Sequence, residues 1–167
     1  MQAVFITGKG WNTWNKALVR RINDALPEDT RLRTMNLRHT KRNPDGARAT
    51  VCDALRLHPE EDLLFWYSGH AGGSTHFSGE RADGALTFGD GPDHAEYSVF
   101  PYDWLAELVC KRSGKTLLVI DGCHSRIAED AFVAVGTDWS HVTLMTSTDN
   151  REDVSYGTVV SNYILDD

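Results

Sequence analysis

Two short stretches of this sequence contain residue types that can do covalent chemistry. Residues 63–72, LLFWYSGHAG, end a large apolar run with a serine, a glycine and His70. Residues 116–126, TLLVIDGCHSR, end a similar run with an aspartate, a glycine and Cys123. A cysteine attacks carbonyl carbon as its thiolate, and a nearby imidazole can take the thiol proton and later protonate a leaving amine. The pair predicts nucleophilic catalysis if the fold brings the two side chains together.

The neighbours of both residues suit an oxyanion site. Gly69 and Gly122 stand immediately before the histidine and the cysteine, and glycine lets a backbone approach a substrate closely. An oxyanion is stabilised by backbone N–H groups. The backbone at Gly69, Ala71 and Gly122, together with the amide of Cys123, is the predicted source of these donors.

Each residue alone also has an ordinary explanation. A single cysteine after an apolar strand is usually a small buried hydrophobe, and a single histidine at a strand end is usually a loop residue. The case for catalysis therefore depends on the elements that position the pair.

Apolar runs alternate with amphipathic stretches along the chain. The patterns predict strands over residues 3–8, 31–37, 62–68, 115–120 and 141–147, and helices over 12–26, 45–58, 101–112 and 156–165. Residues 71–100 are rich in Gly, Asp, Ser and His, which predicts a long loop with a small hairpin around 84–91. Strands separated by helices indicate an α/β fold, with a mainly parallel sheet of about five strands and helices on both faces. Sites in such sheets lie beyond the carboxyl ends of the strands, where both stretches place their polar residues.

Composition narrows the function further. The chain has 167 residues, 41% of them hydrophobic and 25% charged, which suits a single globular domain over residues 1–167. The net charge of −7 argues against nucleic acid as a partner. No apolar run approaches a membrane span and no secretory signal is visible, so we expect no membrane partner. Three widely spaced cysteines do not form a disulfide framework, and a reducing cytoplasm suits them best.

YSGHAG and DGCHSR together resemble the two signatures of the caspase-like cysteine peptidases, closest to the metacaspase and orthocaspase branch. The histidine lies about 50 residues before the cysteine, which is the spacing typical of caspases. The resemblance implies a caspase-haemoglobinase fold, with Cys123 as nucleophile and His70 as general base and acid. Ala71 and Arg126 stand where the family usually has glycine, and the family's usual sixth strand has no counterpart that we find in the sequence.

The resemblance also implies a protein or peptide substrate. In metacaspases an aspartate at the place of Asp121 selects arginine or lysine at P1, and Ser68 matches another position of that pocket. A carboxylate pairs well with a guanidinium, and Asp149 is a third candidate for the pocket. The alternatives are a strand-end cap for Asp121 and a solvated loop residue for Asp149. Metacaspases carry a further acidic residue after the first strand. The corresponding segment of this sequence includes Lys9 and contains no acidic residue.

No cofactor is required for this chemistry, and the spacing of the histidines and cysteines predicts no metal site. Many metacaspases are activated by calcium, and the acidic residues that would supply oxygen ligands here are Asp83, Asp90, Asp93, Glu129 and Asp130. A solvated acidic surface is the alternative reading of these residues. The oligomeric state is not readable from the sequence.

Two other functions compete with a peptidase. A caspase-like regulatory or binding domain with little activity would explain Arg126, Ala71 and the missing acidic residue. Nucleotide binding at the first strand-helix turn would use TGKGWN, residues 7–12, but this segment completes neither phosphate-binding glycine pattern.

Overall fold

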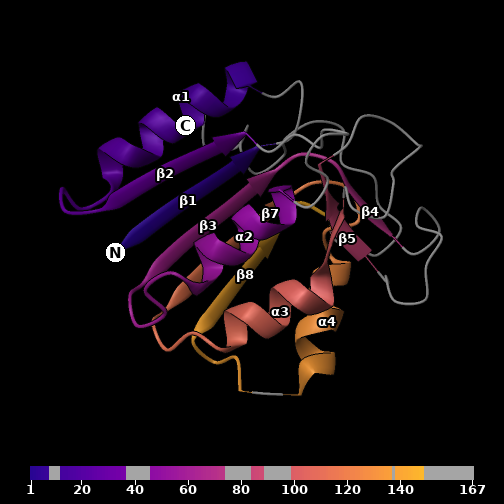
Figure 1. Cartoon of the computed structure of the whole chain (residues 1–167). Coiled ribbons are helices and arrows are strands. Elements are labelled where there is room, and N and C mark those ends of the chain that lie inside the picture. Colours follow the sequence, from indigo (N-terminus) through magenta and orange to yellow (C-terminus); the bar gives the residue numbers. More distant parts are fainter. Residues whose placement is uncertain (8–11, 37–45, 74–83, 89–98, 137, 149–167) are drawn as a thin grey trace.

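A five-stranded parallel sheet forms the centre of the computed structural model, which describes residues 1–7, 12–36, 46–73, 84–88, 99–136 and 138–148 (Figure 1). The order of its strands is β2-β1-β3-β7-β8. Their bounds are Gln2–Thr7 for β1, Arg31–Asn36 for β2, Leu63–Ser68 for β3, Thr116–Asp121 for β7 and Val142–Thr146 for β8. All five strands predicted from the sequence are present.

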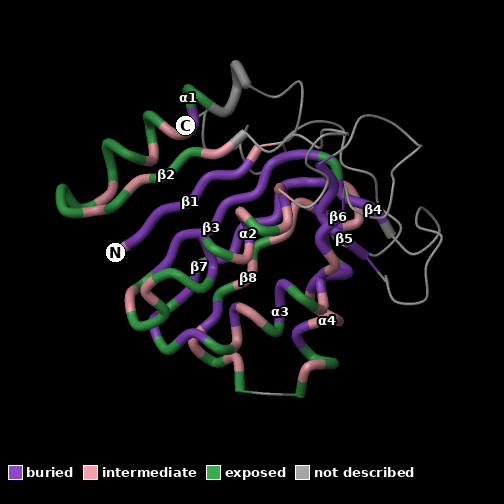
Figure 2. The backbone as a smooth tube through the Cα atoms, viewed as in Figure 1, coloured by how far each residue is buried: buried purple, intermediate pink, exposed green. Residues whose placement is uncertain are grey.

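The central strands are buried because helices cover both faces of the sheet (Figure 2). Every residue of β3 is buried, as its continuous apolar sequence predicts for a parallel strand between two helical layers. Alternate side chains of a strand point to opposite faces. Phe65 and Tyr67 of β3 accordingly join one hydrophobic cluster, while Leu64 and Trp66 join the other.

Four helices form the two outer layers. Helix α1 (Asn12–Ala25) covers one face, where its Leu18 packs with Leu64 and Trp66. Helices α2 (Gly46–Arg56), α3 (Tyr102–Cys110) and α4 (Ile127–Val135) supply buried side chains to the cluster on the other face. The predicted helices over 12–26, 45–58 and 101–112 are confirmed with slightly shorter bounds, and the one predicted over 156–165 lies outside the described residues. None of the four is long and apolar enough to cross a membrane.

Helix α4 is a feature that the sequence analysis did not predict. It lies between β7 and β8, which pair in parallel and therefore need a crossover connection. Its Ala128 and Phe132 are fully buried at helical spacing, and Gly136 ends it with a left-handed φ of 66°. The helix follows the nucleophile candidate directly, so it bears on the position of Cys123.

A second, antiparallel sheet stands where the sequence predicts a loop with a small hairpin. It consists of β4 (Ala71–Gly73), β5 (Gly84–Thr87) and β6 (Val99–Pro101) in that order. The prediction of a hairpin alone is therefore wrong, because β5 pairs on both sides. The polar composition of residues 71–100 concealed a few apolar residues, of which Ala85, Leu86 and Phe100 are completely buried.

Candidate functional site

The histidine and the cysteine follow two neighbouring strands that are in register. Strand β3 pairs with β7 in parallel, and the last pair of the ladder joins Ser68 to Asp121. His70 and Cys123 each lie two residues beyond that pair, so the two segments that carry them leave the same edge of the sheet at the same level. The predicted juxtaposition of the two strand ends is present in the structure.

The two connections also touch each other through their backbones. The N–H of Gly69 donates to the carbonyl of Asp121 at 3.2 Å. A Cβ atom on Gly122 would lie 2.6 Å from the carbonyl oxygen of Gly69 and 3.2 Å from the Cβ of Ala71. Only glycine fits at residue 122 because of this approach, which holds the chain before Cys123 against the chain around His70.

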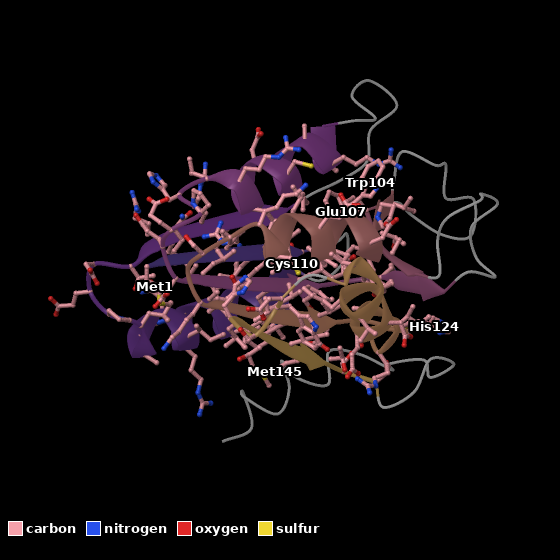
Figure 3. All side chains as sticks on the ribbon, turned by 90° about the horizontal axis from the view of Figure 1, so that it is seen from below. Met1, Trp104, Glu107, Cys110, His124 and Met145 are labelled. Atoms are coloured by element: carbon pink, nitrogen blue, oxygen red, sulfur yellow. The ribbon has the colours of Figure 1, made fainter. Side chains whose placement is uncertain are left out.

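Exposure divides the predicted site residues into two groups. His70 is exposed and Cys123 is half-buried, so a substrate in solvent can reach them. The next residue, His124, lies at the end of the molecule opposite Met1 (Figure 3). Ser68 and Asp121 are each only 1% exposed. The predicted pair is thus at the surface, while the predicted pocket residues lie beneath it.

Ser68 and Asp121 share one face of the sheet. Residues paired in a parallel ladder point the same way, and both lie two positions after residues of the α1-side cluster, Trp66 and Val119. The hydroxyl of Ser68 is buried and has no hydrogen-bond partner. It lines a cavity of about 10 Å³ with Trp66 and Leu18. That volume suits one water molecule rather than a side chain, so a P1 residue would not fit into this cavity.

A cluster of hydroxyl groups supports the turn that carries Cys123. The side chain of Ser147 accepts from the N–H of Gly122 and donates to its carbonyl, both at 2.9 Å. Ser125 accepts from the N–H of Ser147 at 3.0 Å, and Thr148 accepts from the N–H of Arg126 at 3.1 Å. These bonds fix residues 122–126 between β7 and α4. The sequence analysis missed this support, although the run of hydroxyl residues at the end of the fifth predicted strand was a signal for it.

The turn also contains a residue in an uncommon conformation. His124, directly after Cys123, has a φ of 52°, which lies in the left-handed region that non-glycine residues rarely adopt. Such a conformation persists only where the surroundings impose it. Here the hydroxyl cluster on one side and the start of α4 on the other enforce a sharp turn at the nucleophile candidate.

Hydrogen bonds decide which N–H groups near the pair can serve an oxyanion. The N–H of Gly69 donates to Asp121 and that of Gly122 donates to Ser147, so both already have protein acceptors. The N–H of Ala71 points in the direction opposite to the His70 carbonyl that precedes it. Because the carbonyl of His70 faces Thr87 of β5, and the two ends of a trans peptide point in opposite directions, the next N–H points away from β5. These bonds leave the N–H of Ala71 as a candidate oxyanion donor, beside the N–H of Cys123 that the sequence predicts.

The other predicted residues lie on α4 or outside the described residues. Asp149 and the calcium candidates Asp83, Asp90 and Asp93 belong to the latter group. Glu129, on α4, forms an ion pair with Arg126. In the part of the chain that the structure describes, His58, Glu60 and Glu61 are the one group with metal-ligand spacing, and they precede β3 at the opposite edge of the sheet. Glu61 is ion-paired with Arg31, so we assign no cation to them.

Comparisons with protein-family models, curated proteins and solved structures give no match for this chain. The site therefore has to be interpreted from its own geometry and from the residues that form it.

Proposed function

We propose that this protein is a cysteine endopeptidase with a caspase-like fold, in which Cys123 and His70 form the catalytic dyad. The observation that carries the proposal is the register of β3 with β7, which brings the two residues to one solvent-reached edge. The five-stranded parallel sheet is compatible with the caspase-haemoglobinase fold that the two sequence signatures imply. Active sites of open α/β sheets lie at this edge.

The reaction proceeds through an acyl-enzyme. His70 takes the proton of the Cys123 thiol, the sulfur forms a bond to the scissile carbonyl carbon, and the π electrons move to the oxygen. The oxyanion collapses, the C–N bond breaks, and His70 gives its proton to the leaving amine. Water, deprotonated by His70, then attacks the thioester and releases the new carboxyl group and the thiol.

The donors for the oxyanion are the N–H groups of Ala71 and Cys123. Gly122 contributes in a different way, because its missing side chain allows the two connections to approach, and Gly69 contributes through the bond of its N–H to the carbonyl of Asp121. An N–H group aimed at the developing charge lowers the barrier more than it strengthens substrate binding. Alanine is sufficient at residue 71, since only its backbone takes part.

The preferred P1 residue in this proposal is arginine or lysine. Asp121 supplies a carboxylate that is almost completely buried, and Ser68 supplies a buried hydroxyl beside it in the register. A desolvated carboxylate favours a cationic partner, and the planar guanidinium can bind it with two parallel hydrogen bonds. The cavity lined by Ser68 has room for one water molecule only. The P1 side chain would therefore bind on the solvent side of Ser68 and Asp121 rather than between β3 and α1.

A panel of fluorogenic peptides with Arg, Lys or Asp at P1 tests the proposal. We expect cleavage after Arg and Lys, none after Asp, and none by Cys123→Ala. The measurement is repeated with and without calcium, which the sequence resemblance names as an activator. If wild type and Cys123→Ala are equally inert on every peptide, the chain is not a peptidase, and a caspase-like binding domain becomes the better interpretation.

A further inference from the structure

The peptide group between His70 and Ala71 is held by an unusual number of hydrogen bonds. The carbonyl oxygen of His70 accepts from the N–H of Thr87 at 2.9 Å and from the hydroxyl of Thr87 at 2.9 Å. It also accepts from the hydroxyl of Tyr67 at 2.5 Å. Three donor groups thus lie within hydrogen-bond distance of one carbonyl oxygen, which has two lone pairs.

The two donor residues belong to the buried interior rather than to the surface that carries His70 and Cys123. Tyr67 is 0% exposed and Thr87 is 2% exposed. Tyr67 lies on the face of β3 opposite Ser68, and the single proton of its hydroxyl has a second acceptor, the carbonyl oxygen of Thr87 at 2.7 Å. Burial raises the pKa of Tyr67 well above its usual value, so its hydroxyl keeps the proton that it donates.

The place of this peptide in the chain gives the hydrogen bonds their consequence. Only Gly69 and His70 separate β3 of the parallel sheet from β4 of the antiparallel sheet. A peptide group is planar, so fixing the direction of the His70 carbonyl also fixes the opposite direction of the Ala71 N–H. That N–H lies beside the nucleophile turn, since a Cβ on Gly122 would be 3.6 Å from the Ala71 nitrogen.

We propose that Tyr67 and Thr87 are positioning residues that lock the His70–Ala71 peptide and thereby aim the Ala71 N–H at the oxyanion of the reaction. The inference rests on the proposed peptidase function and extends it to two residues that never touch the substrate. Without the lock, rotation of this single peptide would turn the N–H away from the nucleophile turn and a carbonyl towards it. An oxyanion site needs donors that are already oriented before the charge develops.

Tyr67→Phe removes one donor and keeps the buried ring. We expect kcat to fall about ten-fold, the equivalent of one hydrogen bond, while KM changes less than about two-fold, because the lock acts on the transition state. Thr87→Val should act in the same direction, and Thr87→Ser should retain activity because it keeps both donors. These two variants decide the matter if Tyr67→Phe does not fold.

Tyr102→Phe is the matched control. Tyr102 is also buried, at 1% exposure, but its hydroxyl has no hydrogen-bond partner. Removal of this hydroxyl should leave kcat and KM as they are in wild type. A fall in kcat for Tyr102→Phe equal to that for Tyr67→Phe would assign the effect to a disturbed core and overturn the proposal.

A second readout is independent of catalysis. The ¹³C′ resonance of His70 reports the hydrogen bonds that its carbonyl accepts, so it should shift in Tyr67→Phe and Thr87→Val and stay in Tyr102→Phe. Wild-type kcat in Tyr67→Phe, or an unmoved resonance, overturns the lock while the peptidase proposal stands. If the wild type is as inert as Cys123→Ala, the peptidase proposal fails, and the resonance alone decides whether Tyr67 and Thr87 lock the peptide.

Discussion

Position in the fold distinguishes the three cysteines from one another. All three are half-buried and none is in a disulfide, but only Cys123 follows a strand end at the carboxyl edge. Cys52 lies on α2 and packs against the larger core cluster. Burial raises the pKa of its thiol, and Asp53 adds to the effect while Arg56 and Arg48 oppose it. Since the thiolate is the reactive form, Cys52 is a poor nucleophile in the folded protein.

We therefore predict a difference in alkylation of Cys52 between the folded and the unfolded chain. At pH 8, iodoacetamide should modify Cys52 more slowly in the native protein than in urea, because burial disfavours the thiolate. The native rate should still be rising above pH 9.0, the ordinary value for the thiol, where the rate in urea levels off. Peptide mapping by mass spectrometry measures both rates. Equal rates in the two states would show that the thiol is not held in the core.

The same shift gives a pH dependence of stability with a definite sign. A thiol whose pKa is higher in the folded state holds its proton more tightly there than in the unfolded chain. Its contribution to stability is complete below the unfolded pKa and is lost as the pH rises through the folded one. Cys52 should thus make unfolding easier in alkaline solution.

Glycine at residue 122 couples two elements, whereas glycine at residue 136 only ends one. In Gly122→Ala the new Cβ would meet the backbone oxygen of Gly69 at 2.6 Å, and backbone cannot move aside as a flexible side chain does. The ends of β3 and β7 must then separate. Displacement of about 1 Å at a reacting pair costs on the order of 100-fold in rate, and overpacking costs roughly 1–3 kcal/mol of stability.

Gly136→Ala is the control for this effect. Its φ of 66° disfavours alanine, but the nearest atom to an added Cβ is 3.9 Å away. We expect a loss of about 1 kcal/mol from the unfavourable conformation, with peptide cleavage per folded molecule unchanged. Urea unfolding and the fluorogenic peptide measure the two properties separately. Normal cleavage by Gly122→Ala would mean that the contact between the two connections does not hold the site.

Prediction from the sequence succeeded where one local signal decided the element. The continuous apolar run of β3 and the helical spacing of apolar residues in α2 could both be recognised in the sequence. The pairing of the strands was harder to predict, since the register that joins Ser68 to Asp121 depends on residues more than 50 positions apart. The small sheet was missed because its strands are short, with only four residues in β5, and about ten residues separate β5 from each of its partners.

The candidate site divides in the same way. His70 and Cys123 could be selected as candidates from the sequence, because their residue types and the neighbouring glycines suit a catalytic pair. The hydroxyl groups of Tyr67, Thr87 and Ser147 were not, because serine, threonine and tyrosine are common and only the fold brings them to a particular carbonyl or N–H. Positioning groups are therefore harder to predict from one sequence than reacting groups.

The predicted dyad and a buried arginine lie at the two ends of the central sheet. The carboxyl edge carries the predicted dyad. The amino edge carries Arg112, which is 3% exposed and donates to four backbone carbonyls at the end of α2 and in the connection to β3. Its acceptors are the carbonyls of Leu55 at 2.5 Å, Leu57 at 3.3 Å, His58 at 3.0 Å and Glu61 at 2.9 Å. A strand of six residues, about 20 Å long, separates this group from the site.

Arg112→Met keeps much of the side-chain volume but leaves these carbonyls without their donor. We expect a loss of about 3 kcal/mol or more in the free energy of unfolding, since each buried group left unpaired is costly. Arg112→Lys should recover only part of it, because one ammonium group cannot reach acceptors that a planar guanidinium spans. Urea unfolding followed by circular dichroism measures the loss.

Cleavage by these two variants tests whether the ends are independent. When rates are corrected for the folded fraction, both should match wild type, because strands β3 and β7 keep their register at the carboxyl edge. A fall in the corrected kcat would show that strain at the amino edge is transmitted along the strands to Cys123. Stability close to wild type in Arg112→Met would instead show that solvent replaces the guanidinium at little cost, and that the amino edge is held by other contacts.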